Sequence, residues 1–300
     1  MLLFVEQLVN GCALGSLYAL FAVGFGLVFA TLGILNAAHG TYASWAAIAA
    51  LAAVQHLGAP FPLAVAAGVV AGGLLALLVD QIAFQPLRGR GGPAKEGGML
   101  GALITSIAFW IMLDSLAGFA TGQQSLNFPA DSYPARMLHL GALPLPSMQL
   151  VTIAAMLLAT AGIHALVRHS RFGAAMRAVG WNGAAAALGG VNPRVVIVVT
   201  AFLAGATSGL AGVLGGISTQ NVSFTLGEGL MLKGFAAVVV GGYDDVRGAA
   251  IAGVALGILE VMSAQYLSTS LRDGITYALL LGFLLLRPRG LFGRAAFLRA

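Results

Sequence analysis

Long apolar stretches, separated by short polar or charged segments, make up almost the whole chain. Residues 7–79 contain no Asp, Glu, Lys or Arg, and about 20 apolar residues suffice for one helical crossing of a bilayer. The stretches lack the sustained period-two alternation of a transmembrane barrel, so they indicate helices. We therefore expect an all-α polytopic membrane protein, with residues 1–300 as a single transmembrane domain. The predicted spans are 7–29, 41–57, 61–84, 99–121, 149–167, 195–218, 222–242, 248–267 and 272–286.

Two polar interruptions lie inside otherwise apolar sequence. The first is Leu35-Asn36-Ala37-Ala38-His39-Gly40, and the second runs over 218–223 with Gly227-Glu228-Gly229 shortly after it. Irregular backbone at membrane depth is tolerated only where protein or water covers it, and transporters place binding sites there. We therefore expect about eight to nine transmembrane helices, with one or two broken or re-entrant segments. The corresponding positions of the breaks suggest an internal repeat, although the residues themselves show no convincing self-similarity.

The composition agrees with a chain embedded in lipid. It is 59% hydrophobic and 8% charged, whereas soluble domains are about a quarter charged. The single cysteine, Cys12, excludes an intrachain disulfide and is read as a small packing residue. No His, Cys, Asp or Glu grouping has metal-ligand spacing, so neither a metal nor another cofactor is expected.

The basic residues are concentrated in three segments, which fixes an expected topology. Eleven of the fifteen Lys and Arg lie in 86–97, 168–194 and 287–300, with Glu96 as the only acid there. The positive-inside rule places all three segments in the cytoplasm. Nine crossings then put the N-terminus outside and the C-terminus inside, in agreement with the charge. A continuous basic surface for nucleic acid is not indicated.

Small residues recur at helical spacing within the spans. Two glycines four residues apart lie on one helix face and let another backbone come close. Such pairs are common by chance in a chain with 42 glycines, so helix packing is the interpretation for all of them. The pairs are Gly11/Gly15, Gly68/Gly72, Gly205/Gly209, Gly212/Gly216 and Gly253/Gly257.

Two segments between spans are long enough to carry a function. Residues 168–194 predict one or two short helices, interrupted at Asn182-Gly183, and such a loop is either a handle for another protein or only a charged topogenic loop. Residues 122–148 form the longest external segment and contain four prolines. They fit either a docking surface for a partner or a short re-entrant piece.

The loop from 168 to 194 resembles the cytoplasmic loop of branched-chain amino-acid ABC-transporter permeases. The similarity rests on Ser170-Arg171-Phe172-Gly173-Ala174-Ala175-Met176-Arg177-Ala178-Val179 and on Leu188-Gly189-Gly190-Val191-Asn192. It continues, in the order of the family, through 15–20, 36–40, 209–214, 233–242 and 287–293. The chain departs from the family pattern at Ala37, at Gly183-Ala184 and at 243–247.

The resemblance implies a permease subunit of a binding-protein-dependent ABC importer in the bacterial inner membrane. Its implied partners are a second homologous permease, two ATP-binding cassette subunits, an external solute-binding protein and membrane lipid. Neither Lys95 nor Lys233 stands in a P-loop, so ATP must be hydrolysed on another polypeptide. The chain is therefore not expected to be an enzyme. The residues that the resemblance assigns to ATPase coupling are Phe172, Met176, Arg177, Ala185, Ala186, Leu188 and Gly189.

Polar groups near the breaks are the candidates for a substrate pathway. Glu228 and Lys233 either contact a zwitterionic solute or neutralise each other, and His39 is either a proton carrier or a hydrogen-bonded structural residue. Asp114 and Glu260 are expected to be solvated near an interface or paired between helices. The predicted pathway residues are Tyr18, Asn36, His39, Asn221, Glu228 and Lys233.

The expected solutes are branched-chain or related small amino acids, and other readings stay open. Related permeases handle amides, urea or small carboxylates. An ion-coupled secondary transporter of small polar solutes would use embedded titratable groups such as Glu228, Asp114 and His39. An intramembrane enzyme would need a catalytic pair on facing spans, and the sequence shows none.

Overall fold

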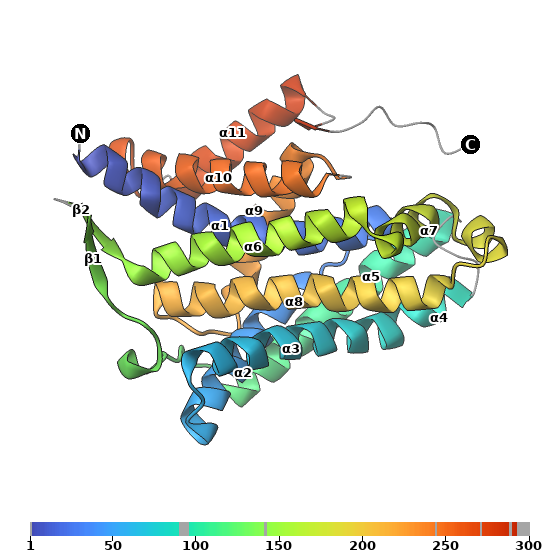
Figure 1. The fold of residues 1–300 in the computed structure, drawn as a ribbon, viewed down its shortest axis with the longest axis horizontal. Helices are drawn as coiled ribbons and strands as arrows, with labels where there is room; N and C mark the ends of the chain where they lie inside the picture. Colours follow the sequence, from blue (N-terminus) through green and yellow to red (C-terminus); the bar gives the residue numbers. More distant parts are fainter. Residues whose placement is uncertain are drawn as a thin grey trace.

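Helices form the body of the molecule in a computed structural model, which describes residues 2–89, 96–140, 143–243, 245–270, 272–287 and 290–292 (Figure 1). Two short strands, β1 (Met137–Leu140) and β2 (Leu143–Pro146), pair antiparallel in a hairpin. Apart from this short hairpin, the elements of the described residues are helices, and the predicted all-α class is confirmed. The helices are α1 (Leu2–Leu32), α2 (His39–Leu57), α3 (Phe61–Val79), a π-helical turn (Asp80–Phe84), α4 (Gln85–Gly89), α5 (Glu96–Ala120), α6 (Ser147–His169), α7 (Arg171–Leu188), α8 (Pro193–Thr219), α9 (Leu226–Gly241), α10 (Val246–Tyr266) and α11 (Arg272–Leu286).

Each predicted span overlaps one of these helices, but the helices differ in length. Within the described residues, six helical stretches are long and apolar enough to cross a membrane. They are 2–32, 61–88, 100–120, 147–169, 193–219 and 246–266. Helices α9 and α11 have 16 and 15 residues, or only about 24 and 22 Å, against a hydrocarbon core of about 30 Å. Whether α2, α9 and α11 also cross the membrane, which would give the expected eight to nine crossings, stays a prediction.

Glycines fix the closest contact between α1 and α10. Gly11 and Gly15 face Gly253 and Gly257, so that the two backbones touch. A Cβ atom added at Gly15 would lie 2.6 Å from the Cα atom of Val254. The sequence pairs thus mark one helix seam, as predicted, and the structure supplies the partner that the sequence could not name.

A second seam of the same kind joins α3 to α8. Gly68 and Gly72 face Gly205 and Gly209, and a Cβ atom at Gly72 would lie 2.6 Å from the carbonyl oxygen of Gly205. In both seams a helix from the first half of the chain packs against one from the second half.

The two seams belong to a two-part packing pattern. Each half contains a long helix, a non-helical break and a short helix: α1, 33–38 and α2 in the first, and α8, 220–225 and α9 in the second. The first long helix packs on α10 and the second packs on α3. The breaks meet where Gly40 of α2 touches Gly227 of α9. The two halves therefore share one order of long helix, break and short helix, and the internal repeat itself stays a prediction.

The first break is buried in the bundle, whereas the second runs from the exposed Asn221 to Gly227, which packs on Gly40. The hydroxyl of Ser44 donates to the carbonyl of Phe224 and accepts from the amide of Gly227, linking α2 to the second break. The hydroxyl of Ser208, midway along α8, donates to the carbonyl of His39 at 3.2 Å. Because α8 has the length of a full span, this contact places the first break near the middle of the membrane-embedded part.

The segment 122–148 lies over the end of the bundle near the N-terminus, and α4 and α7 lie at the other end (Figure 1). Leu126 forms a β-bridge with Val222 in the second break, and the side-chain amide of Gln220 donates to the hydroxyl of Tyr133 at 2.6 Å. Segment 122–148 and helices α4 and α7 thus lie at opposite ends of the bundle, and the side of the membrane that each end faces stays a prediction. Of the predicted cytoplasmic segments, residues 90–95, 288–289 and 293–300 lie outside the described residues.

Candidate functional site

Five polar side chains from four helices form a charged cluster around the buried Glu260. The ammonium group of Lys233 on α9 donates to Glu260 on α10 at 2.6 Å and lies 2.9 Å from the carboxylate of Asp273 on α11. The hydroxyl of Tyr18 on α1 donates to the other oxygen of Glu260 at 2.8 Å. The guanidinium group of Arg272 on α11 also pairs with Glu260. We call these five residues the charged cluster.

The Glu260 carboxylate is the centre of the cluster. It is fully buried, and a buried carboxylate requires compensating charge and hydrogen bonds. Lys233, Arg272 and the Tyr18 hydroxyl provide them, and the Lys233 ammonium also lies 5.5 Å from the centre of the Tyr18 ring. With Asp273 included, two cations face two carboxylates, so the cluster is electrically balanced.

Of the two roles left open for Glu228 and Lys233, mutual neutralisation is not what the structure shows, since Lys233 pairs with Glu260 and Asp273. Helix α9 is regular from residue 226 onward, and positions five apart on a regular helix point about 140° away from each other. Glu228 is exposed in the first helical turn, where a carboxylate is favoured by the helix dipole. The interhelical pairing expected for Glu260 is confirmed.

Sequence reasoning missed Arg272 and Asp273. Both stand at the start of the last apolar run, where charged residues are read as the ordinary flank of a span. The one available signal was that Glu260, an embedded carboxylate, had no basic residue near it in its own span. Only the packing of α9, α10 and α11 shows that all four charged residues meet.

The first break is lined by aromatic rings, one of which, Phe21, also packs on Gly234 beside Lys233. The ring of His39 is fully buried and has edge contacts with Phe21, Phe25 and Tyr42 at centroid distances of 4.7, 5.5 and 5.3 Å. Among the described residues neither ring nitrogen has a hydrogen-bond partner. Phe21 is three residues after Tyr18 and so shares its helix face.

The other predicted pathway residues have separate surroundings. The Asn36 amide donates to the Tyr42 hydroxyl at 2.9 Å and its oxygen accepts from the backbone of Ala38, so this side chain closes the break. Asn221 is exposed in the second break, and no described hydrogen bond joins its side chain to the charged cluster. Tyr18 and Lys233 are therefore the only predicted pathway residues within the described cluster.

Helix α7 bends where the sequence predicted an interruption. Asn182 leaves the helical conformation, with φ −155° and ψ 102°. Its side-chain oxygen accepts from the backbone of Ala185 at 3.0 Å and so caps the second half of the helix.

The predicted coupling residues divide between an inner and an outer face of α7. Met176 and Ala186 are buried against the bundle and Phe172 is half-buried, while the outer face carries Arg177, Ala185, Leu188 and Gly189. Trp181, which was not predicted, is 73% exposed, and Leu188 is 92% exposed. The outer face of α7 thus presents two large apolar side chains, Trp181 and Leu188, outside the bundle.

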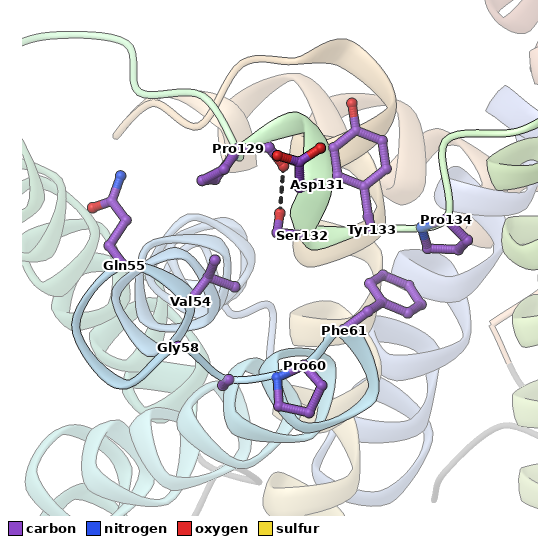
Figure 2. A pocket seen from close by; sticks show the side chains of 11 residues that line it. Val54, Gln55, Gly58, Pro60, Phe61, Pro129, Asp131, Ser132, Tyr133 and Pro134 are labelled. Carbon is purple, nitrogen blue, oxygen red and sulfur yellow. Dashed lines mark hydrogen bonds between the residues drawn. The ribbon is translucent and has the colours of Figure 1, made fainter.

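An open groove lies between the α2–α3 turn and the segment 129–134 (Figure 2). It has a volume of about 810 Å³, and the hydroxyl of Ser132 inside it donates to the carbonyl of Pro129 at 2.6 Å. Its lining residues are Val54, Gln55, Gly58, Ala59, Pro60, Phe61, Pro129, Asp131, Ser132, Tyr133 and Pro134. The groove is at the end of the bundle opposite α7.

Comparisons with known proteins agree with the resemblance seen in the sequence. Residues 7–284 match the family described as branched-chain amino acid transport system, permease component. The high-affinity branched-chain amino acid transport system permease protein LivH of Escherichia coli strain K12 is 32% identical, over 98% of this chain and 96% of its own length. BraD, a permease protein of the same description from Pseudomonas aeruginosa, is 28% identical over 97% of this chain and 96% of its own.

Proposed function

Because this chain belongs to the family of permease components of branched-chain amino-acid transport systems, we propose that it conducts branched-chain or related small amino acids inward across the bacterial inner membrane. It is a multi-pass helical membrane protein, and the family lacks an ATPase activity of its own. ATP is hydrolysed on separate subunits. The observation that carries the pathway is the charged cluster beside two broken helices, since embedded charges mark the routes of polar solutes.

The complete importer contains this permease, a second homologous permease, two ATP-binding cassette subunits and an external solute-binding protein, all held in or on the lipid bilayer. Residues 1–300 act as one transmembrane permease domain, with 168–194 as the cytoplasmic coupling loop and 122–148 as the external loop. The N-terminus lies outside and the C-terminus lies in the cytoplasm. The outer face of α7 then meets the ATPase, and the groove beside Pro60 and Tyr133 lies on the side from which solute arrives.

Co-purification and uptake test this function together. The assembled complex in proteoliposomes should retain a stoichiometric ATPase subunit and take up leucine only with ATP and the binding protein. Labelling of a cysteine introduced at Gly183, in a Cys12→Ser background, should occur only from the ATPase side. Nothing lies within 4 Å of a Cβ atom at Gly183, so the reporter fits. Uptake by the lone permease without ATP would contradict the proposal.

Ala185→Asp should detach the ATPase and leave the permease folded. Ala185 is exposed on the outer face of α7, and a new carboxylate desolvated in a protein groove costs several kcal/mol. We expect at least about a tenfold loss of co-purified ATPase, which corresponds to about 1.4 kcal/mol, with an unchanged thermal unfolding midpoint of the permease.

Two neighbouring variants serve as controls for Ala185→Asp. Ala185→Ser adds a polar group of similar size without charge and should retain the ATPase. Ala186→Asp should instead lower the unfolding midpoint, because Ala186 is buried against the bundle. Full ATPase retention by Ala185→Asp would place the contact elsewhere.

A further inference from the structure

The charged cluster has one fully buried end and one open end. Glu260 is buried completely, and 11% of the Lys233 side chain is exposed. The side chains of Arg272 and Asp273 are 40% and 66% exposed. Charged groups embedded in membrane proteins usually face the bundle interior or a water-filled cavity. The ion pair between Lys233 and Asp273 is open on the Asp273 side and joins the buried Glu260 through Lys233. Helix packing alone does not explain this arrangement.

The buried end is complete without Asp273. Both oxygens of Glu260 are occupied, one by the hydroxyl of Tyr18 and the other by Lys233 and Arg272. Asp273 adds one contact, to the ammonium group of Lys233. The open end thus offers two cations, each already held in place by Glu260, and one carboxylate that is free to change partner.

We propose that Lys233, Arg272 and Asp273 bind the head group of a zwitterionic α-amino acid; this inference rests on the proposed function and identifies where that function selects its solute. The carboxylate of the solute replaces Asp273 on Lys233 and takes remaining N–H groups of Arg272. The ammonium group of the solute binds the released carboxylate of Asp273. No covalent bond changes, and no net charge enters the site.

The energetics favour this exchange over binding of an ion with a single charge. Opening the contact between Lys233 and Asp273 leaves no buried charge unpaired, because Lys233 keeps the Glu260 carboxylate and Asp273 is 66% exposed. A zwitterion restores one carboxylate to Lys233 and one cation to Asp273. A solute with only a carboxylate or only an amine leaves an uncompensated charge, which is expensive away from bulk water.

Protection of a cysteine at position 274 tests the proposal in the assembled importer. Gly274 follows Asp273, is exposed, and has nothing within 4 Å of an added Cβ atom, so Gly274→Cys fits in a Cys12→Ser background. Labelling by a water-soluble maleimide is measured in proteoliposomes without the binding protein. The added probes are leucine, α-ketoisocaproate, which lacks the ammonium group, and isoamylamine, which lacks the carboxylate.

We expect leucine at millimolar concentration to slow labelling and the two single-charge probes to fail at the same concentration. Asp273→Asn should raise the leucine concentration for half protection at least about tenfold, equivalent to about 1.4 kcal/mol. Asp131→Asn, an exposed acid of the outer groove, should leave it unchanged. Equal protection by the single-charge probes, or no effect of Asp273→Asn, would overturn the site. Absent protection in a complex that still performs ATP-dependent uptake would also overturn it, while the proposed function would stand.

Discussion

Gly15→Leu is expected to eliminate the folded permease, whereas Gly162→Leu is expected to leave it intact. At Gly15 the first side-chain carbon would lie 2.6 Å from the backbone of Val254. The neighbouring backbone of α10 cannot move aside as a side chain would. The cost should therefore exceed the about 1–3 kcal/mol typical of overpacked side-chain cores. Separation of α1 from α10 would also pull Tyr18 away from Glu260.

Gly162→Leu is the control that separates the effect of a backbone clash from the effect of replacing a helical glycine with leucine. Gly162 is exposed on α6 and has nothing within 4 Å of an added Cβ atom, so leucine there faces open space and favours the helix. Size-exclusion chromatography of detergent extracts should show a monodisperse peak for Gly162→Leu and aggregation or loss for Gly15→Leu. Equal profiles for the two variants would show that the α1–α10 contact tolerates separation.

Lys233→Met should lower both stability and uptake, and adding Glu260→Gln should repair only the stability. Loss of the ammonium group leaves two carboxylates facing Arg272 alone, and removing one partner of a buried pair costs about 3 kcal/mol. The double variant is again balanced, because one cation faces one carboxylate. It still lacks a cation of the proposed solute site, so ATP-dependent uptake should stay low in a complex that assembles normally.

Glu228→Gln in the Lys233→Met background is the matched control for this repair. Glu228 is exposed in the first turn of α9 and belongs to no described ion pair, so removal of its charge should not restore the unfolding midpoint. Restoration by Glu228→Gln would mean that the sequence-based pairing was correct. Full uptake by the double variant with Glu260→Gln would remove Lys233 from the solute site.

Features that depend on local sequence were predictable. Helices at the predicted positions, both breaks and the bend at Asn182 follow from hydropathy, Gly and Asn over a few residues, and the structure has all of them. Glycine pairs were recognised as packing positions, but their partners lie far away in the chain. Gly15 meets Gly257, and no local pattern connects the two.

The charged cluster was predictable only in part, for the same reason. Lys233 and Glu260 are 27 residues apart and meet only because α9 and α10 lie side by side. Proximity in the sequence favoured Glu228 as the partner, which the regular helix prevents. The loop from 168 to 194 was interpreted either as a contact for another protein or as a charged topogenic loop, and packing of its helix on the bundle was not anticipated. Burial of Met176 shows that internal packing explains the inner face.

Because α1 packs on α10 and α3 packs on α8, each half of the chain must wait for the other during synthesis. Gly11 and Gly15 leave the ribosome more than two hundred residues before the α10 glycines on which they pack. At about 5–20 residues per second, the nascent first helix waits on the order of ten seconds or more for its neighbour. During that time its bare backbone stripe must be covered by lipid, by the insertion machinery or by another chain. Neither half can complete its helix packing before the other half is inserted. The bundle therefore reaches its final packing only near the end of synthesis.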